Sequence, residues 1–197
     1  MPRGIPLTEQ EQAQRRREIF DASVKLFLEK GFPETSMREI AEAAGMGKSS
    51  LYDYFRTKDE ILAFVIEEET AILTQQAQAI ARQSFPPEAR LKRVMETHFT
   101  FMQENRNLFS RLSAEALRLK AESQRGIQQR RYAYQDLVAG IIQEGISQGR
   151  FRAVDPLNAA RLLLNSLLSV LYTTRPTASA EAMLEEAVDI FLRGITR

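Results

Sequence analysis

Apolar residues recur every three to four positions along most of this chain, the spacing that places them on one face of an α-helix. Helix-start signals such as Ser, Thr, Asp or Pro, and helix-stop signals such as Gly or Pro, divide the pattern into about nine segments. No stretch alternates apolar and polar residues in the way expected of a strand. The sequence therefore predicts an all-α protein with helices near residues 11–29, 36–44, 48–55, 57–83, 87–104, 107–119, 123–148 and 155–174, and a last helix from 177 or 179 to 195.

Two of these predicted helices are short and are joined by a tight turn. Ser36 and Glu39 have the S-x-x-E spacing of a capping box, and Gly45 can adopt the left-handed conformation that ends a helix. In the second short helix, Leu51 and Phe55 fall on one side and small polar residues fall on the other. A helix-turn-helix that reads the major groove needs such a second helix. An ordinary αα-hairpin in a helical bundle has a similar pattern, so periodicity leaves both interpretations open.

The order of residues in this stretch resembles a known family. T-S-M-R-E-I-A-E-A-A-G (residues 35–45) followed by K-S-S-L-Y-D-Y-F-R-T-K-D-E-I-L (residues 48–62) is similar to the DNA-binding segment of the TetR family of bacterial transcriptional regulators. The resemblance implies an N-terminal three-helix DNA-binding domain over residues 13–73, with its helix-turn-helix near 36–55. It also implies a C-terminal helical domain over residues 74–197 that binds a ligand and dimerises.

The predicted DNA contacts lie at the start of the first short helix, along the second short helix, and at the start of the helix that follows. Small side chains let the backbone approach base edges, while long cationic and phenolic side chains can reach phosphates. The candidate DNA-binding residues are Thr35, Ser36, Arg38, Lys48, Ser49, Ser50, Tyr52, Asp53, Tyr54 and Lys58.

Departures from the family pattern occur at Gly47, Ser49 and Asp53. The family often carries Ser at the first of these positions, and Gly or Ala at the second. At the third it commonly has His or another neutral polar or aromatic residue. A carboxylate there would repel phosphate, so we expect Asp53 either to accept a hydrogen bond from a cytosine N4 or to pair with Arg56 one turn later. The ion pair is slightly favoured.

A mostly apolar face with a few polar groups, the usual composition of a small-molecule site, is expected in the C-terminal domain. A filled core would use the same residues, and a lone histidine such as His98 is more often a hydrogen-bonded core residue than a functional group. Glu115 likewise fits either the edge of an apolar stripe or the interior. The pocket candidates are Met95, His98, Phe99, Met102, Phe109, Tyr134, Asn165, Ser169 and Tyr172.

The last two predicted helices carry more apolar surface than one short pair can hide. A two-fold operator also requires a two-fold protein, so we expect a homodimer through these helices. In the TetR family the last two helices form such an interface. The candidate interface residues are Leu164, Leu168, Leu171, Leu184, Val188, Phe191 and Leu192.

Composition narrows the possible chemistry. The net charge of +1 does not by itself indicate nucleic-acid binding, so any cationic surface must be local, as at Arg15, Arg16 and Arg17. With no Cys and one His, thiolate and multi-His zinc sites are excluded, and we expect no metal or cofactor. G-M-G-K-S at residues 45–49 is not a phosphate-binding loop, because Glu42 stands where that motif needs its first Gly. We expect no enzymatic activity.

The longest apolar stretch, residues 162–172, is too short to cross a bilayer, and the first residues lack the apolar region of a signal peptide. We therefore expect a cytoplasmic protein without membrane contact. The sequence predicts a ligand-responsive repressor that releases palindromic, double-stranded operator DNA when a small, largely apolar molecule binds. An all-helical carrier or interaction module, and a TetR-like activator, are the alternatives.

Overall fold

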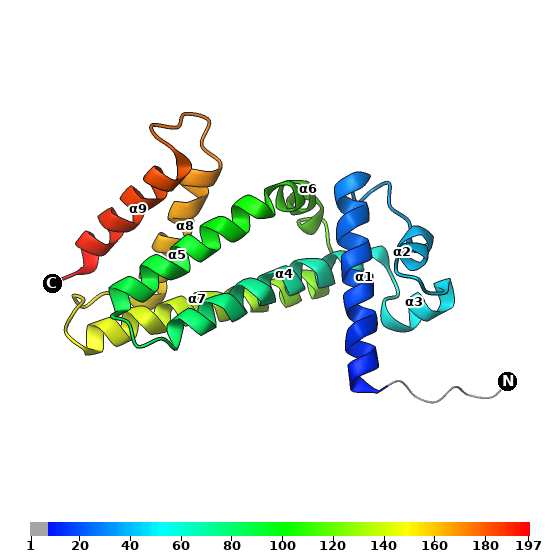
Figure 1. The fold of residues 1–197 in the computed structure, drawn as a ribbon, viewed down its shortest axis with the longest axis horizontal. Helices are drawn as coiled ribbons and strands as arrows, with labels where there is room; N and C mark the ends of the chain where they lie inside the picture. The colour runs from blue at the N-terminus through cyan, green and yellow to red at the C-terminus, as the bar shows by residue number, and fades with distance from the viewer. Residues whose placement is uncertain (1–7) are drawn as a thin grey trace. The chain divides into compact units, whose positions relative to one another are not determined.

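The computed structural model describes residues 8–197, and over this range the chain is all-α, as predicted (Figure 1). Phe151 and Thr196 form an isolated antiparallel bridge. No helix of the described range is long and apolar enough to cross a membrane. The helices are α1 (Glu9–Glu29), α2 (Met37–Ala43), α3 (Lys48–Tyr54), α4 (Lys58–Ala81), α5 (Pro87–Glu104), α6 (Arg106–Ala116), α7 (Ala121–Ser147), α8 (Pro156–Leu171) and α9 (Ala180–Ile195).

The chain divides into two compact units. Of the described residues, the first comprises residues 8–68 together with Asn107–Ile127, and the second comprises Glu69–Arg106 and Gln128–Arg197. Helices α4 and α7 therefore contribute residues to both units. The domain limits expected from the sequence, 13–73 and 74–197, stay a prediction.

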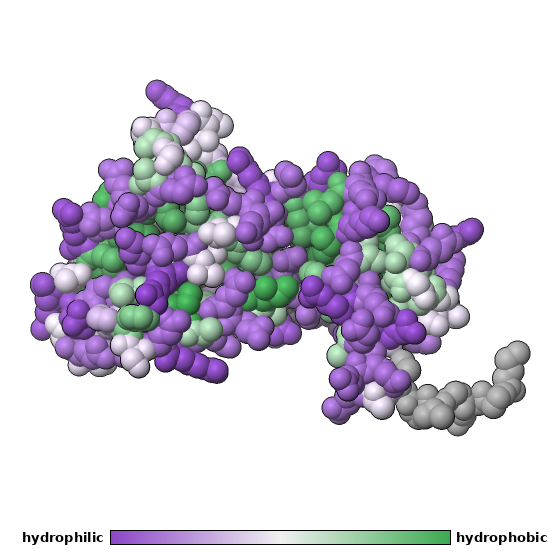
Figure 2. All heavy atoms as spheres, viewed as in Figure 1, coloured by the Kyte–Doolittle hydropathy of each residue, from purple (hydrophilic) through white to green (hydrophobic). Residues whose placement is uncertain are grey.

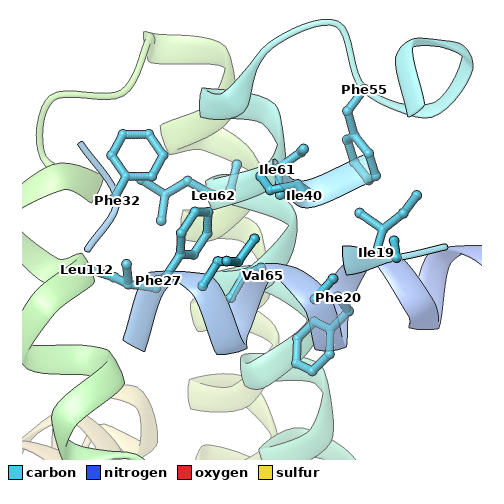
Figure 3. Packing of buried hydrophobic residues seen from close by; sticks show 14 of the residues in the cluster. Ile19, Phe20, Phe27, Phe32, Ile40, Phe55, Ile61, Leu62, Val65 and Leu112 are labelled. Carbon is cyan, nitrogen blue, oxygen red and sulfur yellow. The ribbon is translucent and has the colours of Figure 1, made fainter. Parts of the chain in front are cut away.

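The first unit is built around apolar residues of α1 to α4 and α6. Phe27, Ile40, Leu51 and Leu62 are almost completely buried there, and Leu112 of α6 joins them. Figure 3 shows these helices directing apolar side chains toward one another. Removing this much apolar surface from water is the main force that holds the two short helices in place, because helices of seven residues are not stable alone.

Local signals start and end the helices of the first unit much as the sequence predicts. Ser36 and Glu39 form both hydrogen bonds of the predicted capping box, and Gly45 has a φ of 65° at the end of α2. The predicted box at the start of α4 is only half present. Thr57 accepts from the backbone N–H of Glu60, but the Glu60 carboxylate accepts from the N–H of Arg56 rather than from that of Thr57.

The second unit contains α5, α8, α9 and the larger part of α7. Asp155 caps α8 and Pro156 is its first residue, as predicted. Phe151 is fully buried against Gly145 of α7. Arg90 is a buried cation that pairs with Glu144 at 2.7 Å. Hydrophilic residues cover most of the face visible in Figure 2, with apolar atoms showing between them.

Candidate nucleic-acid interface

Helix α3 has one buried side and one exposed side. Leu51 is completely buried, whereas Lys48, Ser49, Ser50 and Asp53 are exposed. Gly47 caps the helix without a side-chain hydrogen bond. The exposed side therefore has small hydroxyl groups beside one cation and one carboxylate, a composition suited to base edges and phosphates.

Lys48 and Tyr52 form the outer flank of α3. The Lys48 ammonium lies 5.8 Å from the centroid of the Tyr52 ring, and both side chains are exposed. Tyr54 is different, because its half-buried ring packs against the core of the first unit. The side chains of Lys48 and Tyr52 can therefore reach a partner. Truncating Tyr54 would also remove the contacts of its ring with the core of the first unit.

Two predicted contact residues, Thr35 and Lys58, are instead committed to the loop between α1 and α2. Thr35 is buried and its hydroxyl donates to the carbonyl of Gly31 at 2.7 Å. The Lys58 ammonium donates to the carbonyls of Phe32, Pro33 and Thr35 at 2.5, 2.9 and 2.7 Å. An ammonium has three N–H donors, so all of those of Lys58 are occupied. In this structure both side chains thus have partners within the protein, and their DNA contacts stay a prediction.

Ser36 and Arg38, at the start of α2, also have partners within the protein. The Ser36 hydroxyl donates to Glu39 at 2.8 Å, and Lys30 also binds this carboxylate. The hydrogen bond from Lys30, followed by those from Ser36, lowers the pKa of Glu39 to about 2. Arg38 pairs with Glu42 at 2.7 Å, but its side chain is 77% exposed and could exchange this partner for a phosphate.

Asp53 has no ion pair with Arg56 in the part of the chain that the structure describes, so the favoured pairing was wrong. Glu60 instead receives the backbone N–H of Arg56 at 2.7 Å. The helix ends at Tyr54, and Phe55 is extended, with φ −139° and ψ 126°. Asp53 and Arg56 are consequently not on successive turns of one helix, which removes the geometry on which the expected pair depends.

An open cleft of about 850 Å³ lies between the first half of α1 and the helix-turn-helix. The Arg16 guanidinium lies there, 5.5 and 5.2 Å from the ring centroids of Phe55 and Phe64. The arginine cluster of α1 was noticed in the sequence, but Gln12 was not. The cleft is lined by Gln12, Arg15, Arg16, Gly45, Met46, Gly47, Ser50, Asp53 and Tyr54.

The predicted pocket residues do not form one group. Met95, Phe99 and Tyr134 are buried in the second unit, whereas Asn165, Ser169 and Tyr172 are exposed. Met102 is half-buried in the second unit, and Phe109 belongs to the first unit. A cavity of about 310 Å³ between α5 and α9 has Phe99 as its one member of the predicted set. It is lined by Lys92, Glu96, Phe99, Thr100, Gln103, Glu181, Leu184, Glu185 and Val188.

His98 takes part in a polar contact inside the second unit. Its Nδ1 lies 3.2 Å from the Tyr134 hydroxyl, and the two rings meet edge to face. Burial lowers the pKa of His98 to about 4 and raises that of Tyr134. These facts agree with a hydrogen-bonded core histidine.

Glu115 is half-buried and pairs with Arg118 at 3.6 Å, as a residue at the edge of a stripe would.

The predicted dimer residues also separate by burial. Leu171, Leu184 and Val188 are buried within the protomer, so their side chains already pack against their own chain. Leu164, Phe191 and Leu192 are half-buried, and Leu168 is 49% exposed. Two more exposed residues were missed, Leu162 at 62% and Ile190 at 65%. They line one cleft of about 290 Å³ between α8 and α9.

Two family models match the sequence of this chain. The model described as "Bacterial regulatory proteins, tetR family" matches residues 19–65. The model described as "Tetracyclin repressor-like, C-terminal domain" matches residues 84–195. Together the two matches cover both the helix-turn-helix and the helices from α5 to α9.

Individual proteins show the same likeness. The fatty acid metabolism regulator protein of Bacillus subtilis is 24% identical over 157 residues, which are 80% of this chain and 81% of that protein. The transcriptional repressor KstR2 of Mycolicibacterium smegmatis is 26% identical over 196 residues, covering 98% and 96% of the two chains. The crystal structure of FadR from Bacillus subtilis in complex with stearoyl-CoA has a TM-score of 0.76 at 21% identity, covering 91% and 98%, and shows the same fold.

Proposed function

We propose that this chain, which belongs to the tetR family of bacterial regulatory proteins and is a helix-turn-helix transcriptional regulator, acts as a repressor. It releases its operator when an apolar effector binds. The observation that carries the DNA-binding part is α3, with Leu51 buried and Ser49 and Ser50 exposed opposite it. Small hydroxyls can approach base edges, and the exposed Lys48 can reach a phosphate. The repressor assignment is supported by KstR2, a relative that is named as a repressor.

An apolar acyl compound is the effector class that we propose. One relative is named as a regulator of fatty acid metabolism, and one structure of the same fold holds stearoyl-CoA. We propose that the effector enters between the helices of the second unit, beside Met95, Phe99 and Met102 of α5. The cavity between α5 and α9 supports this location through Phe99, which together with Leu184 and Val188 makes up the apolar part of its lining. The rest of that lining is polar or charged.

A homodimer through α8 and α9 completes the proposal. Leu162, Leu168 and Ile190 expose apolar surface on these helices, which a second copy of the chain would cover. A two-fold dimer presents two copies of α3 to two half-sites, which lie about 34–36 Å apart on the duplex. We place the protein in the cytoplasm, together with that DNA.

Helix α4 is the proposed link between effector and DNA. It begins at Lys58 in the first unit, and its residues from Glu69 onward belong to the second. An effector that binds better to one arrangement of this helix shifts the protein toward that arrangement. Even a small displacement of the two α3 helices from their half-sites weakens operator binding.

A pair of titrations tests this proposal. Stearoyl-CoA is titrated into the protein with and without a DNA fragment from upstream of its own gene, and retardation of that DNA is followed in a gel. Thermodynamic linkage requires that effector and operator weaken each other's binding by the same factor. Equal stearoyl-CoA affinities in both titrations would show that the effector does not control DNA binding. Effector binding without any DNA retardation would favour the helical carrier.

A further inference from the structure

Asp53 is a carboxylate on the exposed side of α3. Ser49 and Ser50 precede it by four and three residues, so the three side chains share one face of the helix. Within the described residues Asp53 forms no ion pair, and the nearby Arg56 lies beyond the end of the helix. The protein therefore leaves both oxygens of this carboxylate open to a partner.

The chemistry of the major groove restricts what that partner can be. An ionised carboxylate only accepts hydrogen bonds, and it repels phosphate. The base edges of the groove offer two donors, the N4 amino group of cytosine and the N6 amino group of adenine. Adenine has the acceptor N7 beside its N6 amino group, and N7 would repel the second carboxylate oxygen. Guanine offers only acceptors in the major groove. Cytosine is therefore the base that a carboxylate at this position favours.

The surroundings of Asp53 offset its charge on approach to DNA. It lines the cleft that Arg15 and Arg16 also line. The Arg16 guanidinium lies over the rings of Phe55 and Phe64, which favours its position on this surface. Lys48 adds an exposed cation on the same short helix. The phosphates adjoining the reading helix can thus be bound by cations while the carboxylate faces a base.

We propose that Asp53 is a specificity-determining residue that accepts a hydrogen bond from a cytosine N4 in each half-site of the operator. This inference rests on the proposed function, since it requires α3 to enter the major groove. Position 53 would thus set a base preference in this chain, where many members of the family have a neutral residue.

Selection from a randomised DNA pool tests the inference with three proteins. The wild-type protein should enrich one cytosine in each half-site, with about tenfold discrimination against the other bases. Asp53→Asn should lose this preference and shift toward adenine, because an amide can bind adenine N6 and N7 together. Asp136→Asn is the control, since it removes the same charge from an exposed position on α7. It should select the wild-type sequence.

The outcomes separate the inference from the proposed function. If the wild-type protein enriches no sequence, sequence-specific DNA binding itself is refuted. If Asp53→Asn enriches the same base with the same discrimination as the wild-type protein, Asp53 does not read that base. A variant that binds all sequences more tightly, with unchanged preference, would show that Asp53 contributes charge repulsion alone and would overturn the inference.

Discussion

Lys58 joins the start of α4 to the loop between α1 and α2 through three hydrogen bonds from one ammonium group. Lys58→Met keeps the apolar stem but leaves the carbonyls of Phe32, Pro33 and Thr35 without this donor. Hydrogen bonds from a charged group to partly buried carbonyls are among the stronger ones in proteins. We expect the free energy of unfolding, measured by urea denaturation, to fall by roughly 2 kcal/mol.

Lys48→Met is the matched control, because Lys48 is exposed and lies on α3. Its free energy of unfolding should stay within about 0.5 kcal/mol of the wild-type value. Its DNA affinity should fall, and the slope of log K against log salt concentration should decrease in magnitude by about 0.9 for one lost phosphate contact. If the two variants proved equally stable, the structural role of Lys58 would be refuted.

His98 makes the stability of the protein depend on pH. Burial lowers its pKa to about 4 in the folded protein, below the ordinary value of 6.5. The unfolded chain therefore binds a proton at His98 more readily than the folded protein does. The contribution of neutral His98 to the free energy of unfolding is complete above pH 6.5 and is lost as pH falls toward 4. The loss should reach about 3 kcal/mol in the free energy of unfolding. His98→Gln cannot titrate, so urea denaturation should show a weaker dependence over this range; parallel curves would contradict the assignment.

At the scale of the helices, α7 contains two glycines in contrasting surroundings. A Cβ atom at Gly145 would lie 2.2 Å from Cδ2 of the buried Phe151, whereas one at Gly140 would meet no atom within 4 Å. We expect Gly145→Ala to lower the free energy of unfolding by about 1–3 kcal/mol through overpacking. Gly140→Ala should raise it by about 0.5–1 kcal/mol, since Ala favours the helix. Thermal or urea unfolding that gave both variants the same sign would refute this packing.

At the scale of the whole molecule, assembly depends on the exposed apolar residues of α8 and α9. Leu162→Glu and Ile190→Glu should raise the dissociation constant of the dimer by at least about tenfold, because each would bury an unpaired charge in the interface. Leu117→Glu is the control, since Leu117 is 82% exposed and lies outside these helices. Sedimentation velocity measures the change. A wild-type monomer, or equal effects at all three positions, would contradict the proposed interface.

Local features of this chain were predictable because they depend on residues within one helical turn. The capping box of Ser36 and Glu39, the left-handed Gly45 and the Asp155–Pro156 start of α8 all follow from such short spacings. The period of the apolar residues likewise predicted the helices and the buried side of α3. The order of residues 35–45 and 48–62 indicated the family.

Contacts between residues distant in sequence decided what the local pattern left open. Lys58 donates to carbonyls 23 to 26 positions earlier, and these hydrogen bonds occupy its three N–H donors. Leu184, Val188 and Phe191 belong to the same predicted set of interface residues on α9, yet packing within the protomer buries the first two and leaves the third half-buried. A helical period shows which residues share a face, but only tertiary packing decides whether that face meets its own chain, a second copy or DNA.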